Sequence, residues 1–544
     1  MNPKNLKIIW IALTAGLVCL LVYFPAVKCD FINYDDSLFI TNNPAIRNFD
    51  LKFIKWAFTT SYSGWWMPLV WVSFAVDYYF WGLNPYGYHL TNILLHAVNV
   101  GLVVCIADRV LRLSGFQLVH DELQEQRSKR VYFGVLLLSG LFWGLHPVNV
   151  ESVAWAVERK NVLNGIFSLS CVLYYFIYLE RKEVEGEKGR AIGCFIASAF
   201  LLLFALMTKP VSIVIPPILL VLDCCLFGRF QHGKILQVFA EKIPYLLLSV
   251  VVAMTTVLLA AGNSLLVPLS VYSLTNRLIS TGTAIFDASL MMVYPVDIII
   301  MYLIPNPLPT SYTIKMAAVI CFTLFCLLSV RKSPWLTATW LCFLLPLLPA
   351  LHFFINGAHG ICAHLVYQSS IAPCIAFAAV VGLVCKKTLT MTSRLPRLLL
   401  AVVVASLLLF YVVMTNDLLK EWKNSETIWT RVINIRPVGR AYYYRALFYV
   451  EKNRYNEAID DLQISIKMAL SAGYPDVDEL YALKGDALYK AGRYVEALEA
   501  FTAAISVKPR ATYYYHRGDV FKALGKSREA EYDFSKAGGA VATD

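Results

Sequence analysis

The sequence is short of charge. Only 16% of its 544 residues are Asp, Glu, Lys or Arg, whereas 58% are hydrophobic, and the mean hydropathy is +0.58. This composition excludes a set of soluble domains and predicts a chain that is solvated mostly by the lipid bilayer. The net charge of +11 does not indicate a nucleic-acid partner, because the basic residues fall in short loops between apolar runs.

Two kinds of motif are also missing. The thirteen cysteines are scattered, mostly inside apolar stretches, and no Cys-x-x-Cys pair occurs. This pattern disfavours a disulfide scaffold and a zinc ribbon. No glycine-rich phosphate loop is present, which disfavours a soluble nucleotide-sugar as the substrate.

Apolar runs long enough to cross a membrane recur along the first 415 residues. A span needs about 20 apolar residues. About eleven segments come close to that length: 8–24, 89–107, 131–146, 162–179, 191–207, 211–227, 242–261, 313–330, 335–353, 366–385 and 395–415. No cleavage site follows the first run, so we expect an uncleaved span there. The predicted fold class is all-α, a polytopic membrane bundle over residues 1–415.

The loops between these runs differ in positive charge. One alternating set holds 18 Lys and Arg, and the other holds 7. The positive-inside rule therefore places the first set and the N-terminus in the cytoplasm, and an odd number of spans places the C-terminus outside. The apolar stretch 279–304 is interrupted by Asp287, Pro295 and Asp297, so we expect an interfacial helix within an external region, 262–312. If that stretch crossed the membrane, the C-terminal part would lie inside.

After residue 415 the composition becomes polar and a repeat begins. Aromatic, Gly and Ala positions recur with a period near 34 residues, as in tetratricopeptide (TPR) helix pairs, in units near 439–472, 478–510 and 511–540. We therefore predict an external α-solenoid over residues 416–544. TPR units mostly bind peptides or proteins, here an acceptor protein, although a purely structural cap stays open.

The first external loop, 30–66, holds two adjacent carboxylates, Asp35 and Asp36. One interpretation is a solvated turn, since Asp and Asn make turns and cap helices. The other is a general base whose neighbour orients it, at the depth where a lipid-borne donor meets a polar acceptor. A divalent cation at Asp35 and Asp36 also stays open, but no complete ligand set is readable.

A polar stripe runs down one of the apolar spans. His89, Asn92, His96 and Asn99 follow helical spacing, so they share one face. Polar groups are costly in a bilayer and normally face the protein interior. The stripe either hydrogen-bonds neighbouring helices or lines a substrate cavity. A metal site at His89 and His96 is only weakly indicated, because seven residues separate them and no carboxylate accompanies them.

The second external loop combines acids with cations. Glu151 and Glu158 share a helix face with Trp155, close to the membrane edge. Interfacial anchoring is one interpretation of the flanking basic residues. Because external basic residues are few, each is also a candidate to bind an anion: Arg159, Lys160, Lys209 and Arg277.

Carboxylates and cations thus gather on one face of a multi-span bundle. Transfer from a lipid-phosphate donor needs both, because cations stabilise the departing phosphate and a carboxylate deprotonates the incoming hydroxyl. The alternative is a non-enzymatic, membrane-anchored TPR scaffold, which would not need the polar stripe. A transporter is disfavoured because the spans show no internal duplication.

Several motifs follow the order of a known family: Phe31-Ile-Asn-Tyr-Asp-Asp36, Tyr88-His89-x-x-Asn92, His146-Pro147, Glu151-Ser-Val-Ala-Trp155, Glu158-Arg159-Lys160, Lys209-Pro210 and Trp422-x-x-Ser425-Glu426-x-x-Trp429. Over nearly its whole length the chain resembles the transmembrane-and-TPR family of GT-C glycosyltransferases. The resemblance implies a GT-C fold, a polyprenyl-phosphate-linked sugar as donor, and a catalytic base at Asp35 with Asp36 in support. Eukaryotic members are lumenal O-mannosyltransferases, and resemblance to bacterial members implies the bacterial inner membrane with periplasmic repeats.

We expect the other polar residues to serve the donor. The phosphate is expected near Arg159, Lys160, Lys209, Arg277 and His364, and the cavity walls at His89, Asn92, His96, His146, Glu151, Glu158 and Tyr367. One departure from the family matters. Bacterial relatives commonly carry an acidic–Arg–Tyr–x–Tyr string before a late span, and here the stretch is Ala363-His364-Leu365-Val366-Tyr367. A neutral His binds phosphate more weakly than Arg.

Overall fold

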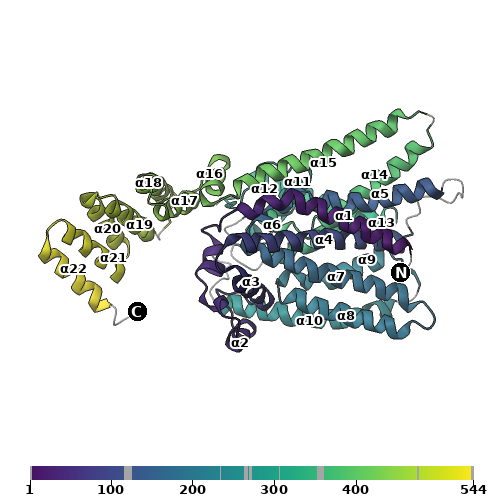
Figure 1. Cartoon of the computed structure of the whole chain (residues 1–544), viewed down its shortest axis with the longest axis horizontal. Coiled ribbons are helices and arrows are strands. Elements are labelled where there is room, and N and C mark those ends of the chain that lie inside the picture. The colour runs from purple at the N-terminus through teal and green to yellow at the C-terminus, as the bar shows by residue number, and fades with distance from the viewer. Residues whose placement is uncertain are drawn as a thin grey trace. The chain divides into compact units, whose positions relative to one another are not determined.

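A computed structural model describes residues 3–115, 125–232, 235–262, 268, 272–305, 307–351, 360–391, 393–474 and 477–540. These residues form helices and connecting loops; they contain no strand, and one isolated bridge joins Tyr62 to Trp65 (Figure 1). The chain divides into two units, residues 1–29 with 38–422 and residues 30–37 with 423–544. Parts of the expected external region 262–312 lie outside the described residues.

The first unit is a bundle of apolar helices. Eight described helices are long and apolar enough to cross a membrane: α1 (Pro3–Tyr23), α4 (Pro85–Leu113), α7 (Arg159–Lys182), α8 (Lys188–Leu206), α10 (Ile235–Gly262), α12 (Thr310–Leu328), α14 (Ile371–Leu389) and α15 (Leu395–Glu421). A bent pair is a ninth candidate: α5 (Glu125–Gly144) with α6 (Val150–Ala154). Two shorter apolar helices match the remaining expected spans: α9 (Ile215–Cys225) and α13 (Pro334–Leu347). The predicted all-α membrane bundle is confirmed.

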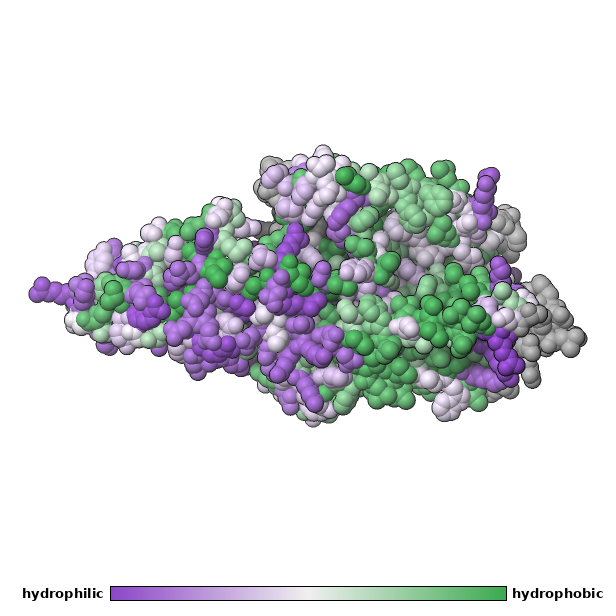
Figure 2. Space-filling view, turned by 90° about the horizontal axis from the view of Figure 1, so that it is seen from above, coloured by the Kyte–Doolittle hydropathy of each residue, from purple (hydrophilic) through white to green (hydrophobic). Residues whose placement is uncertain are grey.

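Much of the surface of this bundle is apolar. Large side chains such as Leu258 of α10, Leu328 of α12 and Val403 of α15 are exposed. Only 6% of the apolar window of α12 and 11% of that of α15 is buried. Figure 2 shows hydrophobic residues gathered over the bundle and hydrophilic residues covering the repeat helices. Such a surface is stable in lipid, where a helix satisfies its own backbone hydrogen bonds.

Small residues let the helices of the bundle approach closely. At Gly16 of α1, an added Cβ would lie 2.8 Å from the carbonyl oxygen of Ala97 in α4. Any side chain at that position would push the two helices apart. Contacts between small residues are typical of membrane helices, since lipid supplies no hydrophobic drive for their association.

Three further helices of this unit lie between the apolar helices along the chain: α2 (Leu51–Thr59), α3 (Pro68–Trp81) and α11 (Leu274–Val293). The α11 helix is not among the candidate spans. It ends at Val293, two residues before Pro295, because proline disfavours helical backbone in the residue before it and lacks the N–H that a helix needs. The apolar stretch 279–304 is therefore divided between a helix and a non-helical segment.

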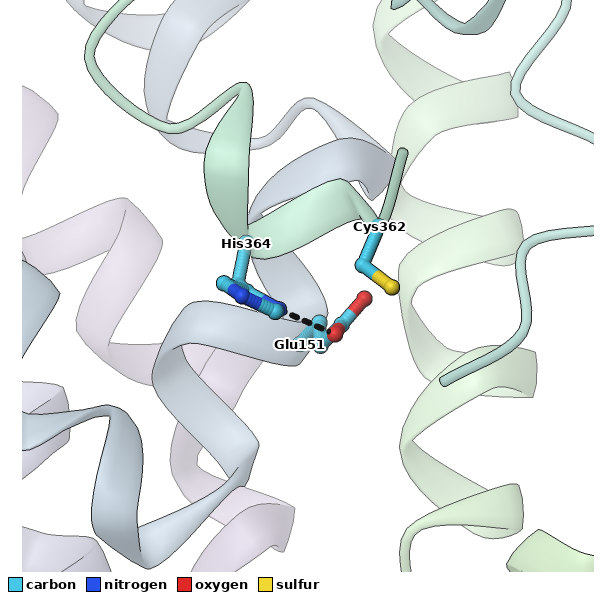
Figure 3. A group of neighbouring side chains, drawn as sticks. All are labelled: Glu151, Cys362 and His364. Atoms are coloured by element: carbon cyan, nitrogen blue, oxygen red, sulfur yellow. Dashed lines mark hydrogen bonds and ion pairs between the residues drawn. The ribbon is translucent and has the colours of Figure 1, made fainter. Parts of the chain in front are cut away.

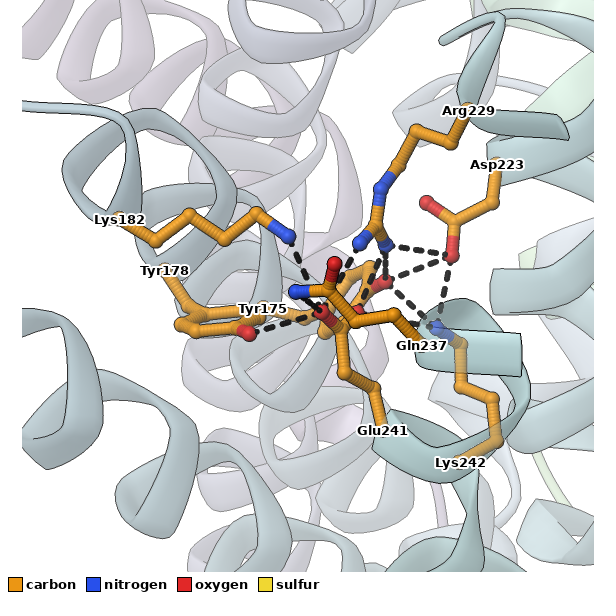
Figure 4. Close-up of polar contacts among 8 residues, drawn as sticks. All are labelled: Tyr175, Tyr178, Lys182, Asp223, Arg229, Gln237, Glu241 and Lys242. Atoms are coloured by element: carbon orange, nitrogen blue, oxygen red, sulfur yellow. Dashed lines mark hydrogen bonds and ion pairs between the residues drawn. The ribbon is translucent and has the colours of Figure 1, made fainter. Parts of the chain in front are cut away.

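A buried set of ion pairs ties together α7, α9 and α10 (Figure 4). Asp223 Oδ2 lies 2.7 Å from Lys242 Nζ and 3.1 Å from a guanidinium nitrogen of Arg229. Glu241 lies 2.7 Å from Arg229 and 3.0 Å from Lys182 Nζ. We call these five residues the five-charge network. Tyr175 donates a further hydrogen bond to Asp223 at 2.6 Å.

The second unit consists of consecutive helices: α16 (Ser425–Ile435), α17 (Gly439–Glu451), α18 (Tyr455–Ser471), α19 (Asp478–Lys490), α20 (Tyr494–Val507), α21 (Ala511–Ala523) and α22 (Ser527–Ala540). Gly485 packs against Phe501, where an added Cβ would lie 2.8 Å from the ring. Gly518 and Phe534 repeat this contact at 2.7 Å. In the first pair Ala446 and Leu462 stand at the corresponding positions, so a smaller side chain faces each larger one.

Candidate functional site

The helical backbone is interrupted twice between α5 and α7, and an acidic residue lies close to each interruption. His146 Nδ1 accepts a hydrogen bond from the N–H of Val148 at 3.2 Å, and Pro147 begins a short turn that leads into α6. After α6 the chain turns again at Trp155 before α7 begins. Glu151 lies on α6 and Glu158 on the turn before α7, and both carboxylates are buried.

Glu151 binds the segment that precedes α14. Its Oε1 lies 2.6 Å from Nδ1 of His364, and its Oε2 accepts a hydrogen bond from the N–H of Ala363 at 3.1 Å. Cys362 begins the same turn, and its buried thiol donates to the carbonyl oxygen of Ile300 at 3.3 Å. Figure 3 shows the side chains of Glu151, Cys362 and His364 pointing toward one another.

Glu158 is connected to two lysines. Its Oε1 lies 2.8 Å from Lys160 Nζ, and its Oε2 accepts a hydrogen bond from Nδ2 of Asn161 at 2.5 Å. Lys209 Nζ donates to Oδ1 of Asn161 at 2.5 Å. Nδ2 of Asn161 also donates to the carbonyl oxygen of His364 at 2.8 Å. We call these residues the carboxylate–lysine cluster: Glu151, Glu158, Lys160, Asn161, Lys209 and His364.

Lys209 differs from an ordinary surface lysine. It stands between two apolar helices, directly before the turn Pro210–Val214, and is only partly exposed. Burial lowers the pKa of its ammonium to about 8, and the negative charge of Glu158 limits the fall. The ammonium is therefore charged at neutral pH and loses its charge just above it.

Arg159 lies beside the cluster in sequence but has other partners. Its guanidinium is fully buried and donates to Asp77 Oδ2 at 2.6 Å, to Asn92 Oδ1 at 2.5 Å and to the carbonyl oxygen of Tyr88 at 2.9 Å. These bonds hold α3, α4 and α7 together. We therefore assign Arg159 a positioning role and leave it out of the proposed phosphate contacts.

Most members of the polar stripe and its neighbours make interhelical hydrogen bonds. His96 Nδ1 lies 2.9 Å from the hydroxyl of Tyr367, and its Nε2 lies 3.0 Å from the carbonyl oxygen of Gly144. Asn99 donates to the same Tyr367 hydroxyl at 3.1 Å. His89 is buried on the same helix, and His146 Nε2 lies 3.1 Å from the Met292 carbonyl oxygen. These contacts match the first interpretation of the stripe, hydrogen bonding between helices.

An apolar cavity lies within the bundle between α4, α7, α9, α13 and α14. Its lining is almost entirely hydrophobic, with Ser168, Thr339 and Gln368 among its few polar members. Gln368 donates to Ser168 at 3.1 Å and also to Asn164, whose Nδ2 contacts the carbonyl oxygen of Lys209 at 3.4 Å. The polar edge of the cavity therefore joins the carboxylate–lysine cluster. The seven residues that were expected to line a cavity are not part of this lining: His89, Asn92, His96, His146, Glu151, Glu158 and Tyr367.

Asp35 and Asp36 belong to the second unit. Asn33, two residues earlier, donates to the carbonyl oxygen of Tyr444 at 2.7 Å and accepts a hydrogen bond from Trp429 Nε1 at 2.8 Å. Asp36 is fully buried, and its Oδ2 accepts the N–H of Ile32 at 2.9 Å. Asp35 is partly exposed. The residues 30–37 are thus held by the helices α16 and α17.

Arg277 lies near the start of α11 and is buried. Its Nε donates to the carbonyl oxygen of Tyr272 at 3.1 Å. This contact fixes the start of its own helix. A role in binding the donor phosphate stays a prediction for Arg277.

Three residues of the site were not predicted: Asn161, Asn164 and Cys362. The two asparagines lie three positions apart, and their side chains both point to the Lys209 segment. Two amides at helical spacing in an otherwise apolar helix are a signal that the sequence carries. Cys362 offers no such signal, since a single cysteine in an apolar stretch is usually a small core residue.

Comparisons with known proteins bear on this arrangement. Residues 478–510 match the Tetratricopeptide repeat family. The chain is 27% identical to Protein O-mannosyl-transferase TMTC4 of Homo sapiens over 246 residues, which are 43% of this chain and 32% of the relative. The resemblance to a transmembrane-and-TPR glycosyltransferase family is confirmed. Protein O-mannosyl-transferase TMTC2 of Homo sapiens is 27% identical over 265 residues, 47% of this chain and 28% of that protein.

A third relative matches a shorter stretch at higher identity. Protein O-mannosyl-transferase Tmtc1 of Drosophila melanogaster is 33% identical over 150 residues, 28% of this chain and 14% of its own. The chain therefore spans about a third or less of the length of these relatives. The name that the three relatives share describes transfer of mannose to proteins.

Proposed function

We propose that the protein is a membrane glycosyltransferase of the GT-C class. It moves a sugar from a polyprenyl-phosphate donor to a hydroxyl group of a protein on the external side. The observation that carries the proposal is the carboxylate–lysine cluster at the polar edge of the apolar cavity. Lys160 and Lys209 can hold a phosphate group there, and the hydrophobic lining suits the lipid tail that such a donor carries.

In the proposed reaction the acceptor oxygen attacks the anomeric carbon of the sugar. The bond between that carbon and the phosphate oxygen breaks, and its electron pair leaves with the phosphate. Lys160 and Lys209 stabilise this negative charge. For the base that takes the hydroxyl proton we keep the sequence-based assignment, Asp35 with Asp36 in support.

The names of the relatives support this reaction class and make mannose the first sugar to test. The TPR unit would recruit the acceptor protein, as such repeats do elsewhere. We also propose that the protein lies in a bacterial inner membrane with a cytoplasmic N-terminus and periplasmic repeats. The loop charges favour this orientation, and labelling of single cysteines from each side of the membrane tests it.

The proposal is tested with the full chain in membranes. Polyprenyl-phosphate-linked mannose is the donor probe, and mass spectrometry of proteins from cells with and without the gene identifies the acceptor and the sugar mass. We expect transfer to fall at least about 100-fold in Asp35→Asn and in Lys209→Met. Asp417→Asn, an exposed acid on α15, is the matched control and keeps wild-type transfer.

Two results would contradict the proposal. If Asp35→Asn transfers as fast as the wild type, Asp35 is not the base. If cells with and without the gene carry identical protein modifications, the non-enzymatic scaffold becomes the better description. In that case the repeats would still pull down a partner protein from the same cells.

A further inference from the structure

Glu151, Cys362 and His364 bring three different metal-ligating groups to one point. A carboxylate oxygen, the thiol sulfur and a ring nitrogen all lie within 4.8 Å of one another. The residues come from α6 and from the turn before α14, so two separate chain segments are fixed around the point (Figure 3). Glu151 and Cys362 are buried, and His364 is partly exposed.

We propose that these three side chains bind a single Zn²⁺ ion. Zinc accepts sulfur, nitrogen and oxygen ligands together, usually in tetrahedral geometry. A thiolate and an imidazole exclude Mg²⁺ and Ca²⁺ as the preferred ions, since these take oxygen ligands. With three protein ligands the fourth position of the ion is left for water or for an oxygen of a bound anion.

The surroundings of His364 support the assignment. Nδ1 faces Glu151 at 2.6 Å, and Nε2, on the opposite side of the ring, lies 4.0 Å from Oε1 of Glu158. A metal-bound histidine usually turns its other nitrogen toward a carboxylate, which fixes the ring. Glu151 is supported in the same way, because its Oε2 accepts the N–H of Ala363.

Binding has a defined proton balance. The thiol of Cys362 loses its proton to solvent and binds as a thiolate, and Nδ1 of His364 binds as the bare nitrogen with the ring proton on Nε2. The hydrogen bond between His364 and Glu151 is replaced by one bond from each residue to the ion. Small side-chain rotations suffice, because the three groups already point toward one another.

A zinc ion here would also account for the histidine at position 364. The family resemblance leads us to expect an arginine there, as a fixed positive charge beside the donor phosphate. The ion would supply that charge at the same place, next to Lys209 and Lys160. This consequence rests on the proposed function, whereas binding of the metal does not.

The test uses the purified full chain in detergent, with no donor or acceptor present. Cobalt(II) is the spectroscopic probe for the zinc site, because a cobalt–thiolate bond produces a charge-transfer absorption band. We expect about one equivalent of cobalt or zinc per chain. The band should be present in the wild type and in Cys374→Ser, a matched control at another buried cysteine on α14, and absent in Cys362→Ser.

Affinities measured by competition with a chelator complete the test. We expect Zn²⁺ affinity to fall at least about 100-fold in Cys362→Ser and in His364→Gln, and about 10-fold in Glu158→Gln. An unchanged affinity in Cys362→Ser overturns the site. Absence of the cobalt–thiolate band in the wild type overturns it too, however the variants fold. Loss of sugar transfer with intact metal binding would instead count against the proposed function alone.

Discussion

The first unit contains two clusters of buried charge, and Lys209 in one of them is held differently from the cations of the other. In the five-charge network Asp223 forms ion pairs with two cations and Glu241 with three, and Asp223 and Lys242 are completely buried. In the carboxylate–lysine cluster the closest partner of Lys209 is the amide oxygen of Asn161. Ion pairs such as those of the five-charge network hold neighbouring helices together. A charge that an amide holds in place can still attract an anion.

The difference also shows in location within the fold. The five-charge network joins the ends of α7 and α9 to the start of α10, where it fixes neighbouring helices. The carboxylate–lysine cluster lies close to the bend between α5 and α6 and close to the starts of α7, α9 and α14. It is at the polar edge of the cavity. We therefore expect substitutions in the first cluster to affect stability and substitutions in the second to affect activity.

The largest effect is expected from Lys242→Met. This change leaves Asp223 and Glu241 with less compensation in a buried position, which costs about 3–5 kcal/mol of stability. Thermal unfolding of the purified chain in detergent measures the loss. Activity per folded molecule should stay at the wild-type level, since Lys242 belongs to the network that connects helices.

A double substitution provides the control for this first prediction. In Asp223→Leu with Lys242→Met both charges are gone, so most of the lost stability should return. If the double variant is no more stable than Lys242→Met alone, direct pairing between these two residues is not what stabilises the network.

The next largest effect is expected from Lys209→Met, on transfer rather than on folding. Removal of one cation from the phosphate site should lower the transfer rate about 100-fold. The unfolding midpoint should change much less than in Lys242→Met, because Asn161 keeps hydrogen bonds to Glu158 and to the His364 carbonyl. Equal losses of stability in the two variants would remove the distinction between the clusters.

A smaller effect is expected from pH. The pKa of Lys209 is lowered to about 8, so its positive charge is present below that pH and disappears as the pH rises through it. Donor binding, measured as KM, should weaken by up to about 10-fold between pH 7 and 9. In Lys209→Arg the guanidinium keeps its charge over this range, so the KM should no longer change with pH.

The long helices and the repeats were predicted because both are local patterns. A run of about 20 apolar residues, or a recurring Gly and Phe spacing, is visible in any window of the sequence. The complete burial of Arg159 could not be predicted from the sequence, because it depends on the ion pair with Asp77, which lies on another helix more than eighty residues earlier. Loop charges indicate the side of the membrane on which a residue lies. They do not show which partner it meets there.

The contact between Glu151 and His364 shows the same limit. Each residue was singled out from the sequence, one from a loop that is expected to be external and one from a position where the resemblance leads us to expect arginine. Their pairing at 2.6 Å depends on the packing of α6 against the turn before α14. Cys362 joins them only through that packing, which is why no sequence pattern marked it as a ligand.

The smallest effect is expected in the repeat unit, where ion pairs lie closer to solvent. Arg517 forms two hydrogen bonds with Asp533 and one with Thr502, and Arg445 repeats them with Asp461 and Thr430. Replacing Arg517 by Met should cost about 1 kcal/mol, measured as chemical unfolding of the full chain. This is below the cost at Lys242, because the Arg517 side chain is 16% exposed, so water can take its place beside the buried Asp533.

The middle helix pair supplies the matched control for this last prediction. Lys484 stands at the position that corresponds to Arg517, and Ala500 at the position that corresponds to Asp533, so the acid that pairs with Arg517 has no counterpart in this helix pair. Lys484→Met should therefore leave stability unchanged. A loss at Lys484 equal to that at Arg517 would show that the aliphatic part of these side chains, rather than the ion pair, stabilises the repeats. The difference in stability between paired and unpaired cations would then apply only to the membrane bundle, where water cannot solvate a buried charge that has lost its partner.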